Sequence, residues 1–455
     1  MQFFHPSFHE RFRFTDWSQI EAKLAELGLS LPRSPDLSVL TRPVELAGRT
    51  VPNALLIHPM EGCDSDELGR PGELTLRRYR RFAAGGAGVI WAEAIAVLPE
   101  GRGNPHQLCL LSETRDSFAR MVEEAHAAAR EALGEAHRPL LIAQLKHAGR
   151  YSRPESAPAP IIARHCPPLD KARGIPSDYP VISDAELAAL PERFAAAARL
   201  AAEAGFDAVD VKACHGYLLH ELLGAYTREG PYGGEFENRV RLLLDTVAAV
   251  RAEVPGLPVG TRLNVYDALP HPWGFGMAAD GSLRPDLKEP LRLMRRLVKA
   301  GVSFFNLAYG NPYYNPHVER PYDTPAGAGY VPQEHPLAGV ALMCELHRQV
   351  HEALPEAVLI ATGLSWLRQF FPCVAAAMVG AGEARLAGVG RMALAYPDFA
   401  RDLLERGELA PEKVCITCSG CSQLMRGGGP VGCVVRDREV YRPLFLAQKR
   451  NEGQS

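Results

Sequence analysis

The chain has 455 residues, of which 47% are apolar and 23% are charged, a composition typical of a globular protein. Its net charge is −3 with both signs interspersed, which indicates neither nucleic acid nor an anionic membrane as a partner. No apolar run reaches the roughly 18 residues of a membrane span, and the N-terminal MQFFHPSFHERFRF lacks the apolar core of a signal peptide. We therefore expect a cytoplasmic protein.

The first 45 residues are predicted to form an N-terminal extension. The stretch WSQIEAKLAELG (17–28) is amphipathic, Thr15 and Asp16 can cap it as a helix, and Gly28 can end it. A linker rich in proline and serine follows. We place the main domain at residues 46–405 and a C-terminal segment at residues 406–455.

Eight short apolar runs rich in strand-forming residues follow one another from residue 54 onward. Amphipathic stretches of helical period separate them, for example residues 117–133, 183–205, 238–254 and 287–301, and Ser183 with Glu186 forms a capping box. The eight runs cover residues 54–59, 88–94, 139–145, 206–212, 257–263, 302–308, 357–363 and 385–391.

Alternating strands and helices predict βαβ units with a parallel sheet. Eight such units favour a (β/α)8 TIM barrel with insertions. The competing interpretation is a doubly wound sheet, which would want a GxGxxG loop after its first strand, and that loop is absent there.

A barrel places its functional residues at the carboxyl ends of its strands. Polar residues or glycines stand at the end of every run or directly after it, as this architecture requires. They are His58, Glu93, Gln144, Lys212, His215, Arg262, Asn306, Gly363, Gly390 and Arg391.

The last two strand ends carry glycine-rich loops, ATGLS (361–365) and GVGRM (388–392). Backbone N–H groups of these two loops often bind phosphate in TIM barrels, and Arg391 adds a positive charge. The pattern predicts a phosphorylated ligand, and the alternative is that the glycines only form turns.

Several motifs in order resemble those of the flavin-dependent old yellow enzyme family. DAVDVKACHGYLLHELLGAYTREGPYGGEFENRVR (207–241) matches its H-x-x-H-G-Y-L and Y-G-G-x-x-E-N-R signature, and AQLKHAGR (143–150) matches Q-L-x-H-x-G-R. HPM (58–60), PEGRG (99–103), TRL (261–263) and VGR (389–391) fall in order as well. The chain looks like the iron–sulfur branch, which includes 2,4-dienoyl-CoA reductase and trimethylamine dehydrogenase, without the C-terminal FAD- and NAD(P)H-binding domains of those enzymes.

This resemblance implies FMN at the mouth of the barrel. Gln144 would bind the pyrimidine edge of the flavin, and Arg262 would stabilise negative charge near N1 and O2. Gly363, Gly390 and Arg391 would hold the phosphate. The other residues expected to contact the cofactor are Pro59, Met60, Glu61 and Glu93.

The resemblance also implies the catalytic residues. Tyr217 matches the tyrosine that donates a proton in alkene reduction, and His215 matches one member of the pair that binds the substrate carbonyl. The other member is usually histidine but is Lys212 here, which would suit a carboxylate or enolate-like substrate. The alternative for Lys212 is a structural ion pair with Glu221 or Asp210.

Two further positions depart from the family pattern or extend it. Glu61 stands where many relatives have Thr or Cys, so it would lower the flavin reduction potential or point to solvent. After the sixth run, the segment 307–323 is rich in Tyr, Asn and Pro, and its His317 matches an active-site histidine of dienoyl reductases. Tyr309, Tyr313 and Tyr314 of this segment could form a substrate cage or simply pack.

Four of the ten cysteines lie near the end of the chain with the spacing C-x2-C-x2-C-x11-C. On a helix the first three would spread over about 9 Å, so a loop around a metal centre suits them better. The spacing and the resemblance favour a 4Fe-4S cluster, and a structural zinc site is the alternative. The ligands would be Cys415, Cys418, Cys421 and Cys433.

The expected activity is reduction of an activated C=C bond in an α,β-unsaturated carbonyl or carboxylate, with the cluster relaying electrons. The alternative is dehydrogenation or N-demethylation of a small amine, and direct NAD(P)H use or a pure electron-relay role are weaker options. Because no dinucleotide-binding loop is present, we expect a separate electron-transfer protein or reductase subunit as partner. The oligomeric state stays open, with a homo-oligomer as one option.

Overall fold

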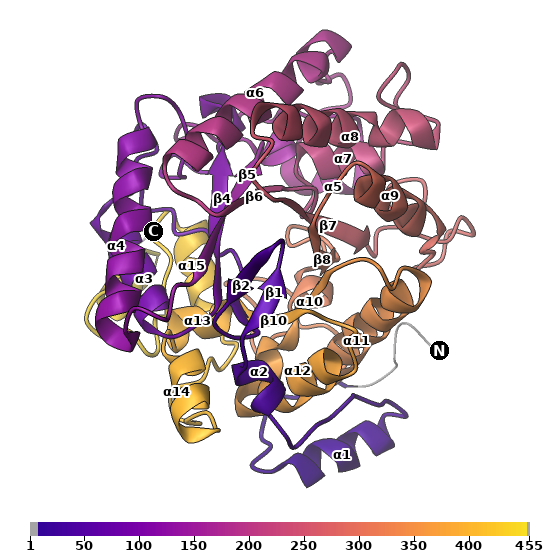
Figure 1. Ribbon diagram of the computed structural model, residues 1–455. Coiled ribbons are helices and arrows are strands. Elements are labelled where there is room, and N and C mark those ends of the chain that lie inside the picture. Colours follow the sequence, from indigo (N-terminus) through magenta and orange to yellow (C-terminus); the bar gives the residue numbers. More distant parts are fainter. Residues whose placement is uncertain (1–7, 453–455) are drawn as a thin grey trace.

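The eight apolar runs form parallel strands that close into a barrel in the computed structural model, which describes residues 8–452 (Figure 1). Each strand pairs with its neighbours in chain order, and the last closes on the first, with Ala387 opposite Leu55. The strands are β3 (Leu55–Ile57), β4 (Val89–Ala96), β5 (Leu140–Lys146), β6 (Ala208–Val211), β7 (Val259–Tyr266), β8 (Phe304–Tyr309), β9 (Leu359–Ala361) and β10 (Leu386–Val389).

Helices surround the barrel and return the chain from each strand to the next, which confirms the predicted (β/α)8 fold (Figure 1). The predicted capping box is present, because the Ser183 hydroxyl accepts from the Glu186 backbone N–H and the Glu186 carboxylate accepts from that of Ser183. The outer helices are α3 (Glu73–Ala84), α4 (Arg115–Leu133), α6 (Asp184–Glu203), α8 (Phe236–Glu253), α9 (Lys288–Lys299), α11 (Pro336–Ala353), α12 (Phe371–Gly380) and α14 (Phe399–Arg406).

A short hairpin closes the amino-terminal end of the barrel. Its strands β1 (Val44–Leu46) and β2 (Arg49–Val51) pair antiparallel and lie across the barrel in Figure 1. Leu46 and Val51 are buried in one apolar cluster with barrel-interior residues such as Trp91. The functional end is therefore the opposite one, at the carboxyl ends of the strands.

The N-terminal extension packs on the barrel. The predicted helix is observed as α1 (Trp17–Glu26), with Asp16 as its N-cap, and α2 (Ser38–Thr41) follows. Trp17 belongs to the same apolar cluster as the barrel helices and lies 6.2 Å, ring to ring, from Phe370. The expected boundary at residue 46 thus falls inside β1, and the extension shares its core with the barrel. The first seven residues of the expected extension lie outside the described residues.

Short helices and the C-terminal segment cover the mouth of the barrel. Asp437 ties the C-terminal segment to α3 through ion pairs with Arg77 (2.7 Å) and Arg81 (2.9 Å). No helix among residues 8–452 is long and apolar enough to cross a membrane. The remaining helices, several of which carry residues of the cavity described below, are η1 (Pro99–Gly101), η2 (Gly149–Tyr151), α5 (Pro167–Arg173), α7 (Leu218–Leu223), α10 (Pro316–Glu319), η3 (Leu364–Phe370), α13 (Arg391–Ala395), α15 (Gly420–Arg426) and α16 (Tyr441–Glu452).

Candidate active site

A cavity of about 470 Å³ opens at the carboxyl ends of the strands. It brings together side chains from loops far apart in the sequence, including the C-terminal segment. Eleven of the thirteen residues that the sequence predicts for catalysis or cofactor binding line it: Pro59, Met60, Glu61, Gln144, Lys212, His215, Tyr217, Arg262, Gly363, Gly390 and Arg391.

Gln144 presents its carbonyl oxygen to this cavity. Its Nε2 donates to Asp210 at 2.6 Å, and its buried Oε1 has no hydrogen-bond partner. Asp210 also accepts from Trp91 Nε1 (2.9 Å) and from the backbone N–H of Arg262 (2.7 Å). Since a carboxylate only accepts, Asp210 fixes the Gln144 amide with its nitrogen inward and its oxygen available to a ligand N–H.

Two arginines lining the cavity keep part of their hydrogen-bonding capacity unused. Arg262 Nε and Arg391 Nη1 are buried without a partner, although Arg391 Nη2 donates to the carbonyl of Pro321 at 2.8 Å. Gly363 has φ +83°, and a Cβ there would lie 2.4 Å from Met343 Sδ, so this close approach of the backbone requires glycine. These donors fit the anionic edge and the phosphate of a flavin mononucleotide.

Tyr217, Lys212 and His215 lie on the loop that follows β6. The Tyr217 hydroxyl is 3.0 Å from Glu61 Oε1 and donates to it, and it lies 3.0 Å from the Tyr313 hydroxyl. Lys212 Nζ lies 4.4 Å from the centre of the Tyr217 ring and 4.0 Å from Glu61 Oε1. The ion-pair partner of Lys212 is therefore Glu61, not Glu221 or Asp210 as the sequence-based alternative proposed.

A second lysine, Lys146, lies 4.6 Å from the centre of the Tyr217 ring. Its ammonium group is buried without a hydrogen-bond partner, and burial lowers its pKa to about 7. Burial alone would raise the pKa of Glu61, but Lys146 and Lys212 outweigh this effect and lower it. Glu61 is thus a carboxylate at neutral pH, held between two lysines and the tyrosine.

His215 is neutral at physiological pH, because burial lowers its pKa to about 4. Its Nε2 lies 3.1 Å from Glu319 Oε1. Glu319 lines the cavity from α10, and sequence reasoning did not identify it. Neighbouring His317 had been predicted instead.

His317 lies outside the cavity. Its Nδ1 is 2.5 Å from the Tyr330 hydroxyl and its Nε2 is 3.6 Å from Glu334. The physical reason is helical geometry, because two positions along a helix are about 200° apart, so His317 and Glu319 face opposite sides. Only the second of the two residues reaches the cavity.

Glu93, which was predicted to contact the cofactor, also lies outside the cavity lining. Its carboxylate accepts from the Gly62 backbone N–H (2.6 Å) and from Arg78 Nη2 (2.5 Å) on α3. The pairing of β4 with β5 is irregular between Trp91 and Ala94, and such a bulge breaks the alternation of side chains. Glu93 therefore supports the loop that carries Glu61.

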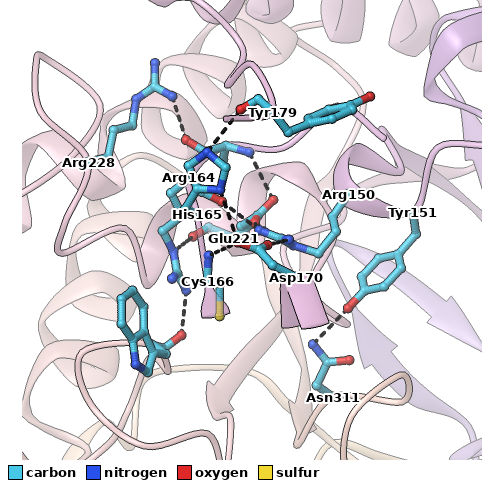
Figure 2. Close-up of polar contacts among 12 residues, drawn as sticks. Arg150, Tyr151, Arg164, His165, Cys166, Asp170, Tyr179, Glu221, Arg228 and Asn311 are labelled. Carbon is cyan, nitrogen blue, oxygen red and sulfur yellow. Dashed lines mark hydrogen bonds and ion pairs between the residues drawn. The ribbon is translucent and has the colours of Figure 1, made fainter. Parts of the chain in front are cut away.

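A buried ion network centred on Arg150 supports the segments that carry Tyr151 and Tyr217, and Figure 2 shows the network with Tyr151. Arg150 is fully buried and donates from Nε to Glu221 Oε1 at 2.8 Å, and it also pairs with Asp170. Arg150 precedes Tyr151 on η2, while Glu221 lies on α7, which begins directly after Tyr217. The network joins the segments that carry both tyrosines, and Tyr151 lines the cavity although the sequence did not single it out.

The four C-terminal cysteines line a second, smaller cavity of about 20 Å³ beside the first. All four are free thiols, and backbone N–H groups lie 3.4 Å from Cys415 Sγ and 3.3 Å from Cys433 Sγ as donors. Cys421 lines both cavities. Within residues 8–452, no three His, Cys, Asp or Glu side chains converge closely enough to hold a single metal ion.

A comparison with protein families matches residues 40–275, slightly more than half of the chain, to the NADH:flavin oxidoreductase / NADH oxidase family. Among curated relatives, the NADPH dehydrogenase of Halalkalibacterium halodurans is 32% identical over 48% of this chain and 61% of its own length. The NADPH dehydrogenase of Geobacillus thermodenitrificans is 29% identical over 60% of this chain and 73% of its own length. The chain thus spans less than two thirds of the first of these relatives.

Solved structures share the fold at low sequence identity. A complex of 2-naphthoyl-CoA reductase with 2-naphthoyl-CoA superposes with a TM-score of 0.69 at 20% identity, over 90% of this chain and 58% of the other. The old yellow enzyme homologue of Zymomonas mobilis has a TM-score of 0.60 at 20% identity, over 82% of this chain and 94% of the other. At this identity the likeness bears on the barrel alone.

Proposed function

Because the chain belongs to the NADH:flavin oxidoreductase / NADH oxidase family, we propose that this flavin oxidoreductase is an FMN-dependent ene-reductase. Its substrate is an activated C=C bond in an α,β-unsaturated carbonyl compound or carboxylate. The observation that carries the proposal is the Tyr217 hydroxyl, which lines the same cavity as the unpartnered atoms of Gln144 and Arg262.

The residues that would hold FMN are those with unused polar atoms. Gln144 Oε1 would accept from a flavin N–H, Arg262 would offer positive charge to the pyrimidine oxygens, and Arg391 would bind the phosphate beside Gly363 and Gly390. When bound, FMN supplies the hydride for alkene reduction. The fixed guanidinium of Arg262 favours the form of the ligand that carries more negative charge.

The chain's own catalytic residues then act on the substrate. His215 and Lys212 donate hydrogen bonds to the carbonyl or carboxylate oxygen and draw electron density from the C=C bond. Tyr217 delivers the proton. Burial and the neighbouring Glu61 raise the pKa of Tyr217 well above its ordinary value, so the hydroxyl keeps its proton at neutral pH until a strongly basic carbon requires it.

The charges in the cavity favour this activity over oxidation of a small amine. Tyr151, Tyr217 and Tyr313 form an aromatic cluster that could in principle hold an alkylammonium ion. However, Lys146 and Lys212 already lie over the Tyr217 ring, and a cationic substrate would be repelled by them. An anionic or carbonyl-bearing substrate is stabilised by the same lysines.

We assign the four C-terminal cysteines to a 4Fe-4S cluster that exchanges electrons with FMN. The four cysteines line one hollow, and backbone N–H donors like those at Cys415 and Cys433 tune the potentials of iron–sulfur sites. Cys421, which lines both cavities, supports a direct electron route.

The source of the electrons is a separate electron-transfer protein or reductase subunit in this proposal. Direct reduction by NADPH is the competing source, since the relatives that match this chain are named NADPH dehydrogenases. Adding NADPH anaerobically to the purified protein separates the two. Rapid bleaching of the flavin by NADPH would remove the need for a partner, and bleaching only by a low-potential protein donor would support one.

The proposed activity is tested on protein purified without oxygen. We expect one FMN, four irons and four sulfides per chain, and reduction of a simple enone with an artificial electron donor. Tyr217→Phe should slow enone reduction at least about 100-fold, while the flavin remains bound. Bound zinc in place of iron would refute the cluster alone, and turnover of an amine but no enone would refute the ene-reductase.

Cys421→Ser provides a matched test of the cluster. It should lower the iron content and leave the barrel's FMN in place, because the residues assigned to FMN lie on the barrel loops and not on the C-terminal segment. Cys344→Ser is the control, since this thiol is buried on α11, away from both cavities. Equal iron content in both variants would contradict the assignment.

A further inference from the structure

Tyr217 needs a source of new protons if it donates one in each turnover. It is buried, with only 3% of its surface exposed, and the hydrogen bonds of its hydroxyl within residues 8–452 go to Glu61 and Tyr313. We infer that Tyr313 reprotonates Tyr217 and connects it to solvent. This inference rests on the proposed function, and it adds a positioning residue to the same site.

The direction of the two hydrogen bonds supports this relay. Glu61 is a carboxylate and can only accept, so the Tyr217 hydroxyl donates to it. The Tyr217 oxygen must then be the acceptor of the bond from Tyr313. The Tyr313 proton thus already points at the oxygen that loses its proton in catalysis.

Tyr313 is the more exposed of the two tyrosines. Of its surface, 38% is accessible, against 3% for Tyr217, and it lines the cavity with its hydroxyl on that of Tyr217. Glu61, the other hydrogen-bond partner of the Tyr217 hydroxyl, cannot replace Tyr313 as proton donor, because its carboxylate carries no proton at neutral pH. The ammonium groups of Lys146 and Lys212 lie over the Tyr217 ring, where their charge stabilises a transient phenolate.

The loop after β8 holds Tyr313 in place for this role. Its backbone N–H donates to Asn311 Oδ1 at 2.9 Å, and its ring stacks on that of Tyr151 at 3.8 Å with an interplanar angle of 20°. Asn311 Nδ2 in turn contacts the Tyr151 hydroxyl at 3.5 Å (Figure 2). Tyr151 follows Arg150, so the buried ion network fixes the far side of the stack.

Each turnover passes one proton along the two tyrosines. The Tyr217 O–H bond breaks and its proton forms the new C–H bond of the product. The Tyr313 proton moves to the Tyr217 oxygen, and a solvent proton restores Tyr313. No electrons move in these steps, and one solvent proton is consumed for each product molecule.

The test compares Tyr313→Phe with the matched control Tyr314→Phe. Tyr314 is a neighbouring exposed tyrosine that does not line the cavity. With 2-cyclohexenone as probe, the first turnover of Tyr313→Phe should slow far less than the later ones, because Tyr217 starts protonated. Later turnovers should slow about tenfold or more relative to the first, so product appears as a burst. Equal slowing of both phases, or slowing of neither, would overturn the relay.

A second measurement does not depend on turnover. In protein with ¹³C-labelled tyrosine Cζ, the Tyr217 signal is identified by its loss in Tyr217→Phe. Tyr313→Phe should shift this signal and its titration, and Tyr314→Phe should not. An unchanged Tyr217 signal in Tyr313→Phe would refute the relay even if the enzyme reduces enones. A shifted signal without any enone reduction would leave the hydrogen-bond chain in place and refute the ene-reductase instead.

Discussion

Asp210 shows at the level of a single residue how a buried carboxylate prepares a binding site that it does not line. It accepts hydrogen bonds from Gln144, Trp91 and the Arg262 backbone, and burial raises its pKa to about 6. Its effect on a ligand therefore passes through Gln144. The Gln144 oxygen faces the cavity only because the amide nitrogen is bound behind it.

Asp210→Asn should consequently weaken FMN binding. An asparagine presents N–H groups as well as an oxygen, so it no longer fixes which end of the Gln144 amide faces the ligand. We expect a loss of about 1.5–3 kcal/mol, or roughly tenfold to 100-fold in Kd, as for a hydrogen bond to a charged group. Quenching of flavin fluorescence on binding measures the Kd. Unchanged binding would contradict the role, and the exposed Asp178→Asn is the control.

His347 gives a prediction for the dependence of stability on pH. It is buried on α11, its Nε2 lies 2.9 Å from the carbonyl of Glu383, and burial lowers its pKa to about 4. In the unfolded chain its pKa is about 6.5, so the unfolded state binds the extra proton first as the pH falls. Neutral His347 therefore contributes stability above pH 6.5 that is lost progressively down to about pH 4.

Between pH 7 and pH 5 this single histidine should lower the free energy of unfolding by about 1–2 kcal/mol. His347→Gln cannot take up the proton, so its free energy of unfolding should fall less over this range than that of the wild type. Urea denaturation at several pH values measures the difference. Parallel curves for the two proteins would show that His347 does not carry this dependence.

At the level of elements, the strands were predictable and the loops between them only partly. The eight apolar runs are buried on both sides, so each shows as a continuous signal, and all eight became barrel strands. Side-chain direction was not predictable where an element is short or irregular. The irregular pairing of β4 turns the Glu93 side chain toward Arg78. On α10 the side chain that reaches the cavity is Glu319, two positions after the predicted His317.

Tyr151 and Arg150 were missed for a different reason. The motif HAGR (147–150), which ends at Arg150 and directly precedes Tyr151, was assigned by resemblance, but its arginine acts through Glu221 and Asp170, which are 71 and 20 positions away in the sequence. Such partners appear only when η2, α5 and α7 meet. The sequence therefore predicted which loops form the site better than which side chains support them.

Arg150→Met tests this junction of three elements. The change leaves Glu221 and Asp170 buried without their cation, and breaking a buried pair costs about 3–5 kcal/mol. We expect a loss of that size in the free energy of unfolding, measured by urea denaturation. Arg80→Met is the control, because its ion pairs with Glu73 and Glu124 are partly exposed and should contribute about 1 kcal/mol or less. Similar losses in both variants would contradict the assignment.

At the scale of the whole molecule, the expected extension, barrel and C-terminal segment meet at one residue, Asp323. Asp323 accepts from the Phe12 backbone N–H (3.2 Å) in the extension and from Trp366 Nε1 (2.7 Å) on η3. Its own backbone N–H donates to Thr417, which lies among the C-terminal cysteines. Arg368 completes the contacts with an ion pair of 2.7 Å. The three segments are therefore expected to unfold together.

Asp323→Ala should loosen the extension directly and the C-terminal segment through Arg368, whose Nη2 also donates to the Ile416 carbonyl at 3.4 Å. It leaves the indole N–H of Trp366 and the half-buried Arg368 without their carboxylate, so we expect a cost of about 3 kcal/mol or more. Hydrogen exchange should accelerate most in residues 9–14 and less in residues 414–419, where the backbone N–H of residue 323 still donates to Thr417, while the barrel strands stay protected. Acceleration at only one of these segments would mean that Asp323 anchors that segment and that the other is held by its own contacts. The Asp437→Ala variant gives the comparison, because Asp437 ties only the C-terminal segment to α3 and should leave exchange in the extension unchanged.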